Sequence, residues 1–207
     1  VLNHINFSIK SNEIFGLIGP NGAGKTTLCK IITGYKNPSY GVVRFKDKDV
    51  NNNNVSLKNT SNNYIGICPQ NDILWNELNA IEHLNFFSKI KGIPSSYEKQ
   101  LISKCMNNVG IKNRKKNNIK YMSGGEKRRL SLALSLLGNP KIIILDEPTT
   151  GIDPLMRNNL WKVISNLKQN KAILLVIIIE EANVLCNRIG IIIKGSMKCI
   201  GSPLELK

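Results

Sequence analysis

The chain has 207 residues, of which 42% are hydrophobic and 21% are charged. This length is typical of one domain with a substantial buried core, and the composition excludes a wholly disordered, collagen-like or coiled-coil chain. Lysine and arginine number 29 against 14 aspartates and glutamates, which gives a net charge of +15. Nucleic acid, a membrane surface and phosphorylated ligands are all compatible with this charge, as is the codon bias of an AT-rich genome.

The five cysteines are scattered and form no CxxC pair, so the sequence indicates neither a disulfide framework nor a zinc site. A reducing compartment fits this pattern best. The longest unbroken apolar run covers residues 172–179, well short of the ~20 residues that cross a bilayer. The chain opens on Val1 and runs directly into a strand-like pattern, which we interpret as the sign of a piece excised from a longer chain.

The first third of the chain mixes short apolar runs with one stretch of helical periodicity. Gly34 is expected to end that helix, and Pro69 to stop the last of these strands. In chain order we expect a buried strand at 13–18, a helix at 25–33, an edge strand at 41–45, a polar surface loop at 47–63 and a strand at 64–68.

Apolar residues at helical spacing then predict a helical lobe between two strand-bearing parts. It extends over about 78–138 and includes a helix at 123–137. The rest of the chain is expected to form a fully apolar strand at 142–145, a helix at 154–168, a strand at 173–179, a short helix and a strand at 189–193. This alternation predicts an α/β fold with a mostly parallel central sheet and antiparallel edge strands.

A glycine-rich loop of the form GxxxxGK[ST] lies between the first predicted strand and helix. Glycines let successive backbone N–H groups turn toward a polyphosphate, and the helix N-terminus adds a partial positive charge. The lysine of this pattern can reach the β- and γ-phosphates, and the hydroxyl after it can coordinate Mg²⁺. The predicted nucleotide-binding residues of this loop are Gly19, Pro20, Asn21, Gly22, Ala23, Gly24, Lys25, Thr26 and Thr27.

Two acidic residues, Asp146 and Glu147, directly follow the apolar strand at 142–145. Ligands of α/β proteins bind at the carboxyl ends of the strands, where these two side chains emerge. Asp146 is predicted to hold Mg²⁺ together with Thr26, and Glu147 to polarise an attacking water. The sequence therefore predicts a P-loop NTPase that uses Mg²⁺, and the nucleotide is identified as ATP only by the resemblance given next.

A third motif lies 23 residues before Asp146, where residues 121–129 read Tyr-Met-Ser-Gly-Gly-Glu-Lys-Arg-Arg. It resembles the signature motif of ATP-binding cassette (ABC) ATPases, with Ser123 as the N-cap of a helix. The resemblance extends over essentially the whole chain. Gln70 matches the Q-loop and residues 148–154 match the D-loop. Its finer features look most like subfamily A transporters, which typically move lipids or amphiphiles.

This resemblance implies that residues 1–207 form one ABC ATPase domain, in which ATP hydrolysis powers membrane transport. Gln70 would contact Mg²⁺ and the attacking water. The site would be completed head to tail by a second such domain, in the same chain or another subunit. The residues implied at that junction are Ser123, Gly124, Gly125 and Asp153.

The resemblance also implies a membrane partner. Transmembrane domains are expected to dock on the segment that starts at Asn71 and ends at Lys91, so that the domain lies on the cytoplasmic face of a membrane. Nucleic acid is not an expected partner. A soluble translation-type ABC ATPase is the alternative from another class, whereas chromosome-organising ABC proteins are disfavoured because only 98 residues separate Lys25 from Ser123.

One position departs from the family pattern. Alignment of the segment around Glu180 and Glu181 places Ile177 where the family has its switch histidine. Isoleucine has no hydrogen-bond donor for a γ-phosphate, so a degenerate domain that binds ATP but hydrolyses it slowly is a further alternative.

Overall fold

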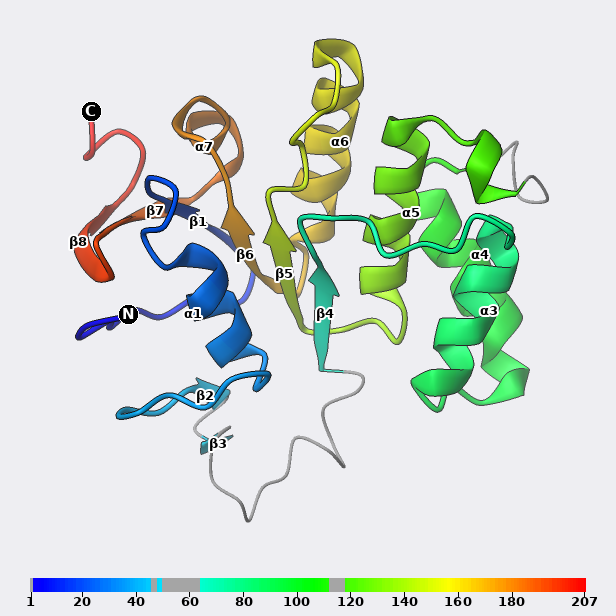
Figure 1. The fold of residues 1–207 in the computed structure, drawn as a ribbon, viewed down its shortest axis with the longest axis horizontal. Coiled ribbons are helices and arrows are strands. Elements are labelled where there is room, and N and C mark those ends of the chain that lie inside the picture. The colour runs from blue at the N-terminus through cyan, green and yellow to red at the C-terminus, as the bar shows by residue number, and fades with distance from the viewer. Residues whose placement is uncertain (1, 46–47, 50–63, 112–117) are drawn as a thin grey trace.

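The structure is a computed structural model that describes residues 2–45, 48–49, 64–111 and 118–207. Within this part of the chain, six strands form the central sheet: β1 (Glu13–Ile18), β4 (Ile65–Cys68), β5 (Ile142–Asp146), β6 (Ala172–Val176), β7 (Arg188–Ile193) and β8 (Ser196–Gly201). Their order is β4-β5-β6-β1-β7-β8 (Figure 1). Every neighbouring pair is parallel except β7 and β8. The predicted α/β fold with a mostly parallel sheet is therefore confirmed.

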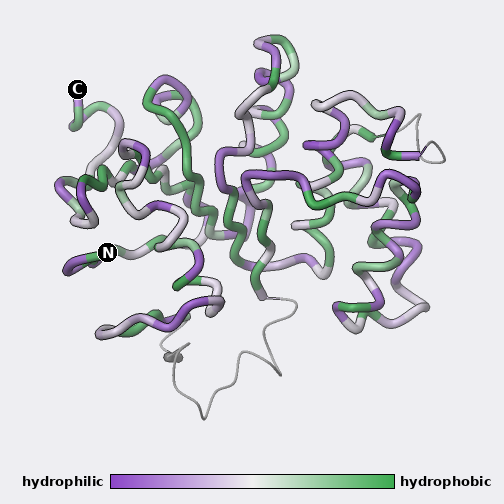
Figure 2. The backbone as a smooth tube through the Cα atoms, viewed as in Figure 1, coloured by the Kyte–Doolittle hydropathy of each residue, from purple (hydrophilic) through white to green (hydrophobic). Residues whose placement is uncertain are grey.

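Helices cover both faces of this sheet, which is why its central strands are hydrophobic along most of their length (Figure 2). On one face, α1 (Lys25–Ile32) packs Leu28 and Cys29 against Phe15 and Leu17 of β1. On the other face, the core is shared by α5 (Gly124–Leu136), α6 (Pro154–Leu167) and α7 (Ile179–Leu185). Ile14 of β1 points to this second face, since successive strand residues alternate sides.

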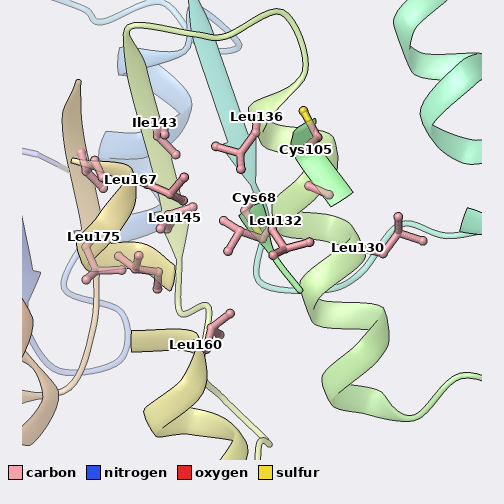
Figure 3. Close-up of a cluster of buried hydrophobic side chains, with 14 of the residues drawn as sticks. Cys68, Cys105, Leu130, Leu132, Leu136, Ile143, Leu145, Leu160, Leu167 and Leu175 are labelled. Carbon is pink, nitrogen blue, oxygen red and sulfur yellow. The ribbon is translucent and has the colours of Figure 1, made fainter. Parts of the chain in front are cut away.

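Between β4 and β5 the chain forms a helical region beside the sheet. Its elements are α3 (Ala80–Ile90), α4 (Ser95–Asn108), the short 3-10 helix η1 (Ile119–Tyr121) and α5. Figure 3 shows Cys105 and Leu132 of this region near Cys68 of β4, with Leu130 farther from the sheet. These residues belong to the same buried cluster, so the helical region and the sheet share one hydrophobic core.

The signature-bearing helix α5 lies directly against β4 because Gly66 has no side chain. A Cβ at Gly66 would lie 1.9 Å from the carbonyl oxygen of Ser135 and 2.9 Å from Cγ of Pro140. Neither distance is sterically possible without movement of the backbone of α5. Glycine at position 66 therefore fixes how closely α5 approaches the sheet.

The structure corrects three sequence predictions. The expected edge strand at 41–45 is only β2 (Arg44–Phe45), which pairs with β3 (Lys48–Asp49) in a separate two-stranded sheet. The predicted strand at 173–179 ends at Val176, because the continuous apolar run hides the turn before α7. The final strand β8 was not predicted. The remainder of the loop expected at 47–63 lies outside the described residues.

Candidate nucleotide-binding site

The glycine-rich loop connects β1 to α1, as predicted. Gly24 precedes the helix in a left-handed conformation with φ of +108°, which a residue with a side chain rarely adopts. Its carbonyl oxygen accepts a hydrogen bond from the N–H of Leu28 at 2.9 Å. The ammonium of Lys25 donates to the carbonyl oxygens of Gly19 at 2.7 Å and Pro20 at 3.2 Å. The loop therefore holds a positive charge among its own backbone atoms.

Asp146 lies next to this loop at the carboxyl end of β5. The hydroxyl of Thr26 donates to Oδ2 of Asp146 at 3.3 Å, although the two residues are 120 positions apart. Asp146 is only 8% exposed, and burial raises the pKa of its carboxyl. The hydrogen bond from Thr26 and the charge of Lys25 oppose this shift in pKa. A hydroxyl beside a carboxylate offers the hard oxygen ligands that Mg²⁺ prefers, so these two residues fit the predicted metal.

Glu147 follows Asp146 and carries the second predicted carboxylate. Its Oε2 accepts hydrogen bonds from Nε2 of Gln70 at 2.9 Å and from the hydroxyl of Thr150 at 3.2 Å. The backbone of Glu147 has a φ of +48°, a left-handed conformation that costs a non-glycine residue about 1–3 kcal/mol. Such conformations persist where the surroundings enforce them, and here the N–H of Glu147 donates to the carbonyl oxygen of Val176 at 3.0 Å.

An open pocket of about 450 Å³ lies between the glycine-rich loop and the connection from β6 to α7. Lys25 and Glu147 line one part of it, and Ile177, Ile178 and Ile179 line another. Ile177 is 5% exposed and packs into the core of the sheet, whereas its two neighbours are about half exposed. The pocket is therefore charged beside the glycine-rich loop and apolar along residues 177–179, and Glu180 of α7 is a further charged residue of its lining.

The signature residues lie elsewhere in the chain. Ser123 is the N-cap of α5, as predicted, and forms a capping box with Glu126 in which each side chain accepts the other residue's backbone N–H. Figure 1 shows α5 and α1 on opposite sides of β4, β5 and β6. The chain therefore does not bring Ser123, Gly124 and Gly125 to its own glycine-rich loop.

Asp153, the predicted residue at a dimer junction, caps α6. Its Oδ2 accepts the N–H of Met156 at 3.0 Å. A Cβ at Gly125 would lie 3.9 Å from Cβ of Met156, so the first turns of α5 and α6 are neighbours. Ser123 and Asp153 are both exposed at the starts of these two neighbouring helices.

Sequence reasoning did not assign a role to Arg128, which the structure places between the loops that carry Gln70 and Glu147. Arg128 is 4% exposed. Its guanidinium donates hydrogen bonds to two loops, at residues 69–72 and 146–148, which carry Gln70 and Glu147. The acceptors are the carbonyl oxygens of Pro69, Gln70, Asp146, Glu147 and Pro148 and the carboxylate of Asp72. The sequence did contain a sign of this role, because Arg128 lies on the same face of α5 as buried apolar residues. An arginine on a buried face needs polar partners, so its position predicts hydrogen bonds to nearby loops.

A second missed contact involves Glu181 of α7, which is 2% exposed. Its Oε2 accepts a hydrogen bond of 2.6 Å from the hydroxyl of Thr149, and its Oε1 lies 3.5 Å from Nε of Arg157. This buried carboxylate therefore joins the segment after Glu147 to α6 and α7.

Comparison with known proteins agrees with this geometry. The sequence model of the family described as ABC transporter matches residues 2–150. ABC transporter A family member 12 of Arabidopsis thaliana is 43% identical over 208 residues, and member 7 is 42% identical over 209 residues. These matches cover 97% and 98% of this chain but 22% of each relative, so the chain spans about a fifth of their length.

Solved structures share the fold. A protein of Clostridium perfringens that is part of an ABC transporter complex superposes with a TM-score of 0.88 at 26% identity, over 99% of this chain and 83% of that one. A dimeric ATP-binding cassette bound to ADP and Pi superposes with a TM-score of 0.85 at 23% identity, over 98% and 90% of the two chains. In the described part of this chain, no helix has the length and apolar character needed to cross a membrane. From its family match, its relatives and its P-loop ATPase fold, we conclude that the chain belongs to the ABC transporter family.

Proposed function

We propose that this chain binds ATP and hydrolyses it to ADP and phosphate, as the nucleotide-binding domain of a transporter. The main support for the proposal is that Lys25, the Thr26–Asp146 contact and the Gln70–Glu147 contact lie together at one end of the sheet. Lys25 lies in the glycine-rich loop, Thr26 contacts Asp146, and Gln70 contacts Glu147. This edge contains the carboxyl ends of β1 and β5, where ligands of parallel sheets bind.

Each residue has a distinct role in this proposal. Residues 19–27 cradle the phosphates with backbone N–H groups, and Lys25 offsets their charge. Thr26, Asp146 and Gln70 are the residues that would hold Mg²⁺, which when bound neutralises phosphate charge. Glu147 accepts a hydrogen bond from the attacking water and orients it, as a carboxylate fixed by two donors can do.

A second domain would complete the site. Ser123, Gly124 and Gly125 begin a helix whose free N–H groups suit a γ-phosphate, and they lie away from the chain's own glycine-rich loop. Head-to-tail pairing brings them to a partner's ATP, with Asp153 at the same junction. The exposed starts of the neighbouring helices α5 and α6 support this arrangement.

Transmembrane domains are the proposed partners of the surface between Asn71 and Lys91. This segment exposes Ile73, Trp75 and Phe86, and the Trp75 ring lies 5.2 Å from the Phe86 ring. Exposed apolar groups in a cluster are typical of protein interfaces. The domain would then lie on the cytoplasmic face of a membrane, and the A family resemblance favours a lipid-like substrate.

Slow hydrolysis is the second part of the proposal. The isoleucines at 177, 178 and 179 contribute to the apolar part of the pocket wall. In this proposal, Ile177 stands at the position of the family's switch histidine. Without that donor, ATP binding is retained but the transition state loses one hydrogen bond.

The proposal is tested by titrating Mg-ATP into the parent protein and two lysine variants. Lys25→Ala removes the ammonium in the loop and should weaken ATP binding severely. Lys30→Ala removes an exposed lysine from the last turn of the same helix and should bind like the parent. Equal affinities for Lys25→Ala and the parent would contradict the nucleotide-binding assignment.

A further inference from the structure

The guanidinium of Arg128 bonds to both members of the Gln70–Glu147 pair through their backbones. Nη1 donates to the carbonyl oxygens of Pro69 at 2.6 Å and Gln70 at 3.2 Å. Nη2 donates to the carbonyl oxygen of Glu147 at 3.1 Å. The side chains of Gln70 and Glu147 in turn meet at 2.9 Å. One buried group thus fixes the two loops from which these side chains project.

The contacts with the second loop surround its strained residue. Nη2 also donates to the carbonyl oxygen of Asp146 at 3.0 Å, and Nε donates to that of Pro148 at 2.9 Å. These carbonyls belong to the residues before and after Glu147, whose φ is +48°. A left-handed conformation of a non-glycine residue needs such external support. Arg128 therefore supplies donors to three consecutive carbonyls across the strained position.

Arginine suits this place better than any other residue. Its planar guanidinium offers five N–H donors in a fixed geometry, whereas lysine offers three from a single nitrogen. Asp72 lies 3.0 Å from Nη1 and balances the buried positive charge. The ion pair and the carbonyl contacts together hold the guanidinium in one orientation.

We propose that Arg128 is a positioning residue for ATP hydrolysis, which keeps Glu147 and Gln70 aligned and connects them to the helix that begins at Ser123. This inference rests on the proposed function. Under the proposed pairing, Ser123 would contact the ATP of the partner domain, whereas Arg128 supports Gln70 and Glu147 at the chain's own ATP. Helix α5 therefore contributes to both nucleotide sites. Ser123 and Arg128 are five positions apart at the start of that helix, so a displacement of Ser123 is transmitted to Glu147 through Arg128.

Kinetic measurements can distinguish a positioning role of Arg128 from a purely structural role. Loss of a structural group lowers stability and impairs ATP binding and hydrolysis together. In the described part of the chain, the acceptors of Arg128 lie in residues 69–72 and 146–148, outside the glycine-rich loop. Loss of a positioning group should therefore lower the rate of hydrolysis while the Kd for ATP stays at the parent value.

The experiment compares Arg128→Met and Arg128→Lys with the parent in the full-length protein that carries this chain. Equilibrium titration with Mg-ATP gives Kd, and single-turnover hydrolysis of radiolabelled ATP gives the rate of the chemical step. Arg128→Met should keep its Kd and lose roughly 10²-fold in rate, the effect of a misplacement of about 1 Å. Arg128→Lys should fall between the two. Lys162→Met, which removes an exposed positive charge from α6, should match the parent.

A milder variant covers the case in which Arg128→Met does not fold. Asp72→Asn keeps every backbone contact of the guanidinium and weakens only the ion pair, so a smaller fall in rate at constant Kd is expected. Parental rates in Arg128→Lys and Asp72→Asn, or parallel losses of binding and rate, would overturn the positioning role. A parent protein that fails to bind ATP would instead refute the proposed function.

Discussion

Gln70 and Glu147 are 77 residues apart in the sequence and meet through a hydrogen bond of 2.9 Å between Nε2 and Oε2. The contact joins the loop after β4 to the loop after β5. It places an amide beside the carboxylate that we assign to water activation. The hydroxyl of Thr150 donates to the same carboxylate oxygen at 3.2 Å. Both donors hold the carboxylate of Glu147 in one orientation.

The variant Glu147→Gln should retain ATP binding and lose hydrolysis. Glutamine keeps the size of the side chain but cannot accept a proton or carry the charge that orients water. We expect the single-turnover rate to fall by roughly 10²–10⁴-fold, the usual contribution of a general base. Glu205→Gln, an exposed change near the C-terminus, is the matched control. A parental hydrolysis rate in Glu147→Gln would assign the catalytic carboxylate to another residue.

The variant Ile177→His should accelerate hydrolysis. It restores a side-chain donor to the apolar wall of the pocket, and one transition-state hydrogen bond is worth about 10²–10³-fold in rate. Affinity for ATP should change little, since Lys25 and the glycine-rich loop are untouched. Single-turnover hydrolysis in the assembled transporter measures the effect, with Val184→His on the exposed face of α7 as the control. A fast parent rate that Ile177→His leaves unchanged would reject the slow-site account.

The variant Asp146→Asn should raise the stability of the nucleotide-free protein at neutral pH. Burial raises the pKa of Asp146 above its ordinary value of 3.8, so its charged form destabilises the folded state. The hydrogen bond from Thr26 can pass to the asparagine oxygen. We therefore expect the Tm of Asp146→Asn to be higher than that of the parent in thermal melts at neutral pH.

The pH dependence of that gain follows from the direction of the shift. Between the unfolded and the raised folded pKa, the folded state binds more protons, so the free energy of unfolding of the parent falls as pH rises. The penalty is complete above the folded pKa and disappears below the unfolded one. The advantage of Asp146→Asn should therefore shrink in thermal melts toward pH ~4. Asp153→Asn preserves an exposed cap and should give no gain at either pH.

Thiol labelling should single out Cys199. Burial raises the pKa of Cys29 and Cys186 to about 12, and that of Cys68 and Cys105 to about 11. Thiols with such values contain almost no reactive thiolate at neutral pH. Cys199 on β8 is only half-buried. Mass spectrometry after brief iodoacetamide treatment should find it modified first, and Cys199→Ser should leave the native protein almost unlabelled until urea is added. Rapid native labelling of Cys29 would contradict the packing of α1.

The glycine-rich loop and the acidic end of β5 could be predicted because their information is local. The pattern from Gly19 to Thr26 needs only a strand before it and a helix after it, and both are present. The capping role of Ser123 was equally local. Residues 142–145 were recognisable as a strand because they are apolar without interruption.

Other features depend on contacts between distant segments. The acceptors of Arg128 come from loops up to 59 residues away, so its role could not be inferred from residues 121–129 alone. The end of β6 was misplaced because eight apolar residues give no period, and only pairing with β1 and β5 sets the boundary at Val176. Pairing with β7 likewise defines β8.

Gly66 allows α5 to contact β4 at Ser135, near the C-terminal end of the helix. Rotation of α5 about this contact (the fulcrum) would move the N-terminal end of the helix (the tip). Ser135 lies at the fulcrum and Ser123 at the tip, about 18 Å away at 1.5 Å per residue. A tilt of about 5° at the fulcrum would move the tip by about 1.5 Å, half the length of a hydrogen bond. The missing side chain at one position of the edge strand β4 thus determines where Ser123, at the far end of the helix, lies. Under the proposed head-to-tail pairing, substitutions at position 66 would change the fit between the two domains without contacting either nucleotide.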